Sequence, residues 1–172
     1  MGPNTGVAPG VIQESHSAVD SALNFKAQVD STALFDGSQW TYSYKITALA
    51  GGPGVGNRPI QGLTVPLDVP VGGVTVDQTT SVSSGHLADF GTLNAGGSTV
   101  GFLWLGSPMV AGEASQWVSF TSTLPPVLKE VGVQDGTVVN VQALVPVPEP
   151  ATYAGLFALG LAGFAAFRRF RA

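Results

Sequence analysis

The sequence predicts a mainly β protein: an antiparallel β-sandwich of the immunoglobulin or fibronectin type, followed by a single C-terminal transmembrane helix. Short segments of alternating apolar and polar residues recur at intervals of about ten residues. Turn-forming residues separate them, since the chain contains 23 glycines and 12 prolines. No segment before residue 151 has a helical period. A jelly roll or a small barrel is the alternative arrangement of the same strands.

The clearest strand signal lies at 39–48, where Trp40, Tyr42, Tyr44 and Ile46 alternate with polar residues. We therefore expect this strand at the centre of a sheet. Residues 23–29 alternate in the same way. Further short strands are expected at 60–67, 74–76, 87–93, 100–104, 116–121 and 137–143.

Charge is distributed unevenly along the chain and limits the classes of partner. Residues 1–147 are mildly acidic, whereas the basic residues of the C-terminal tail are Arg168, Arg169 and Arg171. An acidic body does not attract nucleic acid, so no nucleic-acid partner is expected. The chain has no cysteine, which excludes disulfides, zinc-thiolate sites and a cysteine nucleophile.

Residues 151–167 form an uncharged apolar segment of 17 residues. As a helix it would be roughly 25 Å long, slightly less than the hydrocarbon core of a bilayer, which is about 30 Å thick. Phe170 and the apolar stems of the arginines extend it. Arginine clusters remain on the cytoplasmic side, so 168–172 is expected in the cytoplasm and the body on the opposite side of the membrane.

The segment Val147, Pro148, Glu149 and Pro150, followed by an apolar helix and terminal arginines, resembles the PEP-CTERM sorting signal of Gram-negative bacteria that also make exopolysaccharide. The resemblance covers about the last 26 residues and implies recognition by exosortase, a membrane protease or transpeptidase thought to use a cysteine nucleophile. In this interpretation Val147 to Pro150 are substrate residues, and the two motif prolines hold the peptide extended. The resemblance also implies passage through the inner membrane to the cell surface or extracellular matrix, with extracellular polysaccharide as a further partner.

The predicted organisation has five parts. A flexible N-terminal segment at 1–18 precedes a sandwich at 19–143, and a stiff proline-rich spacer at 144–150 holds the sandwich away from the membrane. The transmembrane helix at 151–167 and the arginine cluster at 168–172 follow. Residues 1–30 contain no basic region followed by an apolar run, so we expect the export signal upstream of the given start.

Chemistry in the body is not expected. His86 lies near Ser84 and Asp89 in the sequence, so a Ser-His-Asp arrangement can be drawn, but no nucleophile motif surrounds it and His16 is isolated. The acidic residues are scattered singly, which predicts no metal site, and no cofactor motif is present. We therefore expect a non-enzymatic protein.

Aromatic residues offer an alternative function. Tyr42, Tyr44 and Trp104 could stack on sugars and make the body a carbohydrate-binding module. Their positions in alternating segments favour the sandwich core instead. Their exposure in the structure distinguishes the two hypotheses.

Overall fold

The computed structural model describes residues 10–20, 25–50, 59–67, 76–77, 85–94 and 96–147. The predicted transmembrane helix at 151–167 and the arginine cluster at 168–172 lie outside the described residues. So do Pro148, Glu149 and Pro150 of the sorting motif.

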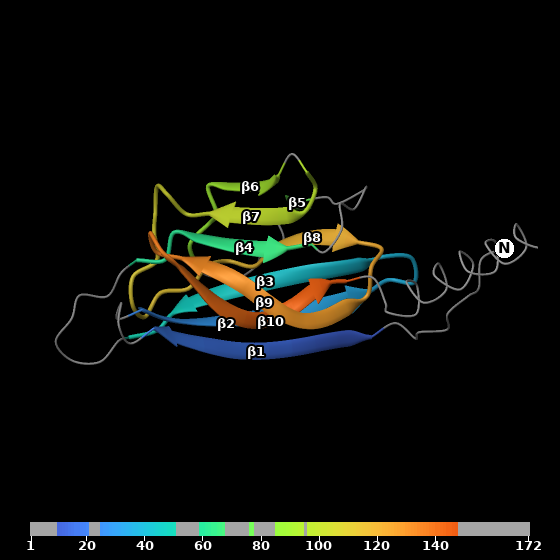
Figure 1. Ribbon diagram of the computed structural model, residues 1–172, viewed down its shortest axis with the longest axis horizontal. Coiled ribbons are helices and arrows are strands. Elements are labelled where there is room, and N and C mark those ends of the chain that lie inside the picture. The colour runs from blue at the N-terminus through green and yellow to red at the C-terminus, as the bar shows by residue number, and fades with distance from the viewer. Residues whose placement is uncertain are drawn as a thin grey trace, which may run out of the picture.

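The described residues form ten β-strands in two five-stranded antiparallel sheets (Figure 1). The strands are β1 (Val11–Asp20), β2 (Phe25–Phe35), β3 (Trp40–Ala48), β4 (Gly62–Pro66), β5 (Val76–Asp77), β6 (Phe90–Leu93), β7 (Thr99–Leu103), β8 (Val118–Ser122), β9 (Pro126–Gln134) and β10 (Val138–Pro146). This confirms the mainly β class.

Sheet 1 has the strand order β1-β2-β3-β8-β5, and sheet 2 has the order β10-β9-β4-β7-β6. The run β2-β3-β8-β5 follows the strand order ABED of an immunoglobulin sandwich, and β4-β9-β10 follows its order CFG. β1 extends the first sheet, and the β6–β7 hairpin extends the second. β3 therefore pairs on both sides, as expected for the segment with the clearest strand pattern.

The core lies between the two sheets. Along β3 every second residue is buried, including Tyr42, Tyr44 and Ile46. The Phe120 ring on β8 stacks near both tyrosines, with ring centroids 5.4 Å from Tyr42 and 6.0 Å from Tyr44. Sheet 2 contributes the facing side chains Leu63, Val65, Val100, Phe102, Val131, Val133, Val141 and Val145. Alternation in the sequence thus corresponds to one inward face per strand.

Polar groups join the sheets within this core. Tyr44 donates its hydroxyl hydrogen to the Leu144 carbonyl of β10 at 2.6 Å, and the Leu144 N–H donates to Ser31 Oγ at 3.1 Å. Ser31 is fully buried. Because β10 is an edge strand, these side chains of sheet 1 satisfy backbone groups that have no further strand as partner. Tyr42 donates in the same way to the Leu124 carbonyl at 2.7 Å.

The predicted start of the proline-rich spacer, at residue 144 of 144–150, is wrong. β10 continues to Pro146, and Leu144 and Val145 are buried. Pro146, at the end of the edge strand β10, is opposite Pro126, the first residue of β9, and a missing N–H is tolerated at both kinds of position. The Val147 N–H then donates to the Pro125 carbonyl at 3.1 Å. Extended backbone is common to strands and proline-rich spacers, so the sequence pattern alone did not separate them.

The N-terminal boundary also differs from the prediction. β1 begins at Val11 and pairs with β2 in the register Val11 to Leu34, so much of the expected flexible segment at 1–18 is a strand. Its weak alternation reflects its position at the edge of sheet 1, where few of its side chains are buried.

We predict that the fold loses stability at alkaline pH. Burial raises the pKa of Tyr42 and Tyr44 above that of unfolded tyrosine, about 10. Their contribution to the free energy of unfolding is therefore complete below pH ~10. Above that pH the tyrosines of the unfolded chain ionise, and the free energy of unfolding falls by up to about 1.4 kcal/mol per pH unit for each tyrosine that stays protonated in the folded chain. In a Tyr153→Phe chain, tyrosinate absorbance should rise together with the loss of the β-sheet circular dichroism signal.

The control is the Tyr42→Phe/Tyr44→Phe chain measured against pH. Its alkaline unfolding midpoint should move upward even though the protein is less stable at neutral pH. Tyrosinate absorbance that rises near pH 10 while the fold persists would contradict this account.

Candidate functional site

The sorting segment leaves the sandwich at the end of β10. β8 and β10 run toward the same end of the molecule, where the connection to β9 turns back (Figure 1). Val147 is partly buried against the core and hydrogen-bonded to Pro125. The first residue of the expected motif is therefore part of the folded body, and Pro148 follows it directly in the sequence.

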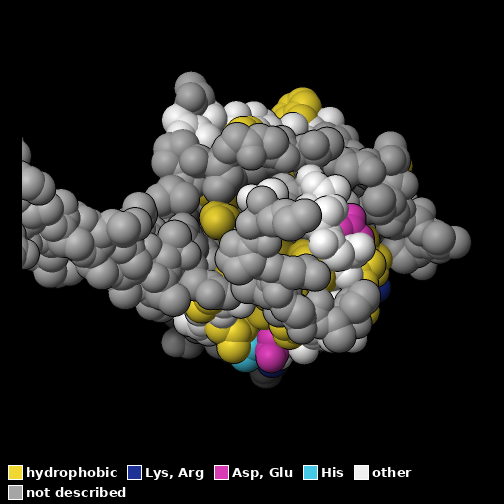
Figure 2. Space-filling view, turned by 90° about the vertical axis from the view of Figure 1, so that its right-hand side faces the viewer, with side chains coloured by type: hydrophobic (Ala, Val, Ile, Leu, Met, Phe, Trp, Pro, Cys, Tyr) yellow, Lys and Arg dark blue, Asp and Glu magenta, His cyan; other side chains and the backbone are white. Residues whose placement is uncertain are grey.

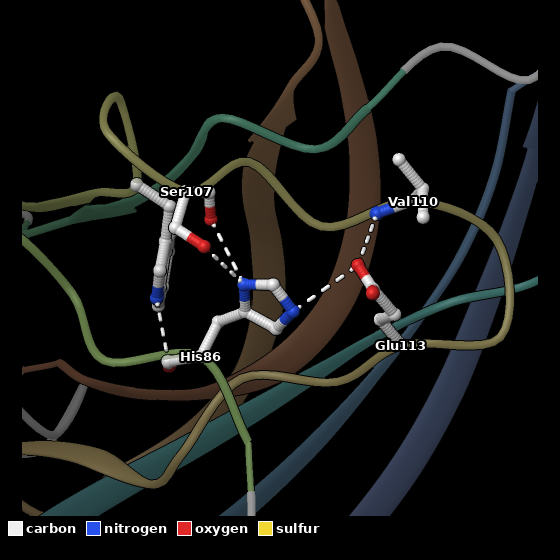
Figure 3. Close-up of polar contacts among 5 residues, drawn as sticks. His86, Ser107, Val110 and Glu113 are labelled. Atoms are coloured by element: carbon white, nitrogen blue, oxygen red, sulfur yellow. Dashed lines mark hydrogen bonds and ion pairs between the residues drawn. The ribbon is translucent and has the colours of Figure 1, made fainter.

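A second cluster surrounds His86 (Figure 3). His86 Nε2 lies 3.1 Å from Glu113 Oε2, and His86 Nδ1 lies 2.8 Å from Ser107 Oγ and 3.0 Å from the Ser107 carbonyl oxygen. The Val110 N–H donates to the same Glu113 oxygen at 2.9 Å, and the Trp104 indole N–H donates to the His86 carbonyl at 3.1 Å. We call His86, Ser107 and Glu113 the histidine cluster.

Local geometry explains why these residues meet. His86 forms a parallel bridge with Ser115, and its N–H donates to the Ala114 carbonyl at 2.9 Å. Gly85 permits this approach, since an added Cβ would lie 2.7 Å from the Ser115 carbonyl group. The Ser115 hydroxyl in turn accepts the Ile46 N–H of β3 at 2.9 Å. The segment is thereby fixed against the central strand.

The histidine cluster has the residue types of a hydrolase triad, and its contacts also join two segments of the body. Nε2 faces the Glu113 carboxylate, and Nδ1 faces both the hydroxyl and the backbone carbonyl of Ser107. The tautomer of the ring decides whether Nδ1 donates to the carbonyl or accepts from the hydroxyl. The cluster therefore ties the loop containing Ser107 and Glu113 to the segment containing His86.

The Ser-His-Asp arrangement drawn from the sequence does not describe the contacts of His86. Asp89 accepts the Gly106 N–H at 2.6 Å and is not a partner of His86 in any hydrogen bond or ion pair described. Ser84 lies outside the described residues. The actual partners, Ser107 and Glu113, are far along the chain, and no local spacing could have identified them. His16 lies 3.4 Å from Glu14 on β1.

The aromatic residues considered for sugar stacking are not exposed. Tyr42, Tyr44 and Trp104 each have 0% of their surface accessible to solvent. A stacking platform built on these residues is therefore wrong, because their rings fill the space between the sheets. The same lack of exposure supports the alternative prediction, which placed these three residues in the core of the sandwich.

Within the part of the chain that the structure describes, no three His, Asp or Glu side chains gather in a way that could hold a metal ion. None of its segments is a helix long and apolar enough to cross a membrane.

Comparison with known proteins identifies the C-terminal region. Residues 146–169 match the PEP-CTERM protein-sorting motif. The chain thus carries a C-terminal protein-sorting signal, and more particularly one of the PEP-CTERM type. No curated protein and no solved structure matches the chain.

We predict that the histidine cluster contributes stability and no catalysis. His86→Ala removes both side-chain ties and should lower the free energy of unfolding by about 1–2 kcal/mol. Ser107→Ala should change it by a few tenths of a kcal/mol only, roughly the effect of a typical surface substitution, because the carbonyl of residue 107 still accepts from His86. Urea unfolding measures both effects.

An esterase assay with p-nitrophenyl acetate accompanies these measurements. Wild type, Ser107→Ala and Glu113→Gln should all show the same background rate. Ser98→Ala is the control for loss of a serine elsewhere in the body. A hydrolysis rate that falls in Ser107→Ala but not in Ser98→Ala would support a catalytic role for the histidine cluster.

Proposed function

We propose that this protein is exported, held in the inner membrane by a helix at 151–167 and handed to exosortase for release to the cell surface or extracellular matrix. The match of the sorting motif to residues 146–169 is the single observation that carries this proposal. The apolar run and the terminal arginines support it, since together they favour a single span with its C-terminus in the cytoplasm.

Within this proposal the residues of the motif have different tasks. Pro148, Glu149 and Pro150 are the recognised peptide, because two prolines keep it extended for a protease cleft. Arg168, Arg169 and Arg171 hold the segment in the membrane with the correct orientation. A cysteine nucleophile would belong to the enzyme, since this chain contains no cysteine.

The body is proposed to act as a non-enzymatic surface or matrix component with an immunoglobulin-type sandwich, in a bacterium that produces exopolysaccharide. The strand order supports the sandwich type. The contacts of His86 with Glu113 and Ser107 join two segments of the body and so support a structural use of this histidine.

The proposal predicts that processing depends on exosortase and on the motif. In the native host, fractionation and intact-mass measurement should find the body outside the inner membrane without its arginines. Deleting the exosortase should leave the full-length chain in the membrane fraction. Replacing Pro148, Glu149 and Pro150 together by alanine should have the same effect, because the recognised peptide is lost.

The control is Glu130→Ala, which removes an exposed acidic residue of the body and should leave release unchanged. Mature extracellular protein that still contains Arg171 would defeat the sorting function. Equal release with and without exosortase would defeat it as well.

A further inference from the structure

Five of the ten large exposed apolar side chains among the described residues lie at the end of the sandwich from which the sorting segment leaves, and the other five, Leu87, Phe90, Leu105, Val110 and Val138, lie toward the opposite end. The strand registers place the start of β1, the end of β2 and the start of β3 together, next to the end of β8. β9 begins at this end and β10 finishes there. The exposed apolar residues here are Val11 (65%), Ile12 (41%), Leu34 (47%), Val127 (42%) and Leu128 (43%), which we call the apolar rim.

At two positions of the apolar rim the core reaches the surface, whereas Val11, Leu34 and Leu128 lie at the outward-facing positions next to them. Ile12 is opposite the buried Ala33, and Val127 is opposite the buried Val145, so both stand at inward-facing positions of their strands. They remain exposed because they lie at the last positions before the strands end. In the view onto this end, the visible described atoms are mostly hydrophobic or uncharged (Figure 2).

The tether between this end and the apolar tail is short. β10 and the Val147 hydrogen bond fix the chain as far as Val147, and three residues separate it from Ala151, where the apolar segment begins. A fully extended chain covers at most roughly 3.6 Å per residue, so about 14 Å separates the two at most. The headgroup layer on each side of a bilayer is already about 5–8 Å thick.

We propose that the apolar rim docks on the lipid surface while the chain is anchored. This rests on the proposed function, since it requires 151–167 to span the membrane. The tether holds the apolar rim within reach of the interface, and such confinement raises its effective concentration to the millimolar range, so a weak apolar contact is sufficient. Burial of these side chains among headgroups and upper acyl chains then removes apolar surface from water.

Charge indicates which lipid surface fits. The β2–β3 turn at this end carries Asp36, whose pKa is lowered by the backbone N–H groups of Gln39 and Ser38, so the carboxylate stays ionised. The body as a whole is acidic. Anionic lipid therefore gives no attraction, and the docking depends on apolar contact with a zwitterionic surface.

The test uses the full chain in phosphatidylcholine vesicles that contain headgroup spin-labelled lipid. The absence of native cysteine allows single fluorescent labels at Leu34→Cys, Leu128→Cys or Val138→Cys. Val138 is 60% exposed and lies at the start of β10, the opposite end of the sandwich, so it is the matched control. Quenching at positions 34 and 128 should be about twofold or more above that at 138.

A second arm separates docking from mere proximity. With the label at Val11→Cys, the added changes Leu34→Ser and Leu128→Ser should reduce quenching, whereas Val138→Ser should not. Circular dichroism confirms that each variant is folded. Quenching that is equal at 34, 128 and 138, or unchanged by the serine pair, would overturn the docking.

Two further outcomes have separate meanings. A chain that an alkaline carbonate wash removes from the vesicles defeats the membrane anchor, and the lipid docking with it. If the chain stays embedded but the labels at positions 34 and 128 change their fluorescence only at high protein density, the apolar rim contacts a second copy of the chain. That result overturns the lipid docking and leaves the membrane anchor standing.

Discussion

The hydrogen bonds of Tyr44 and Ser31 with Leu144 hold the sandwich closed where sheet 2 ends. Leu144 is buried on an edge strand, so its backbone N–H and carbonyl can find neither water nor another strand. A buried backbone group left without a partner costs about 1–3 kcal/mol, which is a large share of the stability of a small domain. Two side chains from the opposite sheet remove that cost and fix the point from which the sorting segment departs.

Local pattern anticipated much of the fold but not this closure. Alternation identified the Trp40–Ala48 strand and its buried aromatic face, because one buried face per strand imposes a period of two. The partners of Leu144 are 100 and 113 residues away, and no local period encodes such contacts. Prolines at alternate positions suit both a spacer and an edge strand. Only the buried environment of Leu144 and Val145 decides between them.

The histidine cluster shows the same limit for a site. Sequence proximity suggested Ser84 and Asp89 as partners of His86, but Asp89 instead accepts a backbone N–H from Gly106. Ser107 reaches the ring because a loop 21 residues further along folds over it, and Glu113 approaches from the other side. Residue types alone would suggest hydrolysis. The partners of each ring nitrogen are visible only in three dimensions, and they join segments that are distant in the sequence.

The hydrogen bonds at Leu144 also mark where the folded body ends and the sorting segment begins. Among the described residues, the contacts that hold Val147 come from the body, through Pro125 and the surrounding core. Cleavage at any position after Val147 would therefore leave all of β10 and its cross-sheet hydrogen bonds intact. Once the anchor is removed, the apolar rim would no longer be held at the lipid surface and would be exposed to solvent. In the proposed scheme, a single cut thus changes what this end of the sandwich can contact without changing its fold.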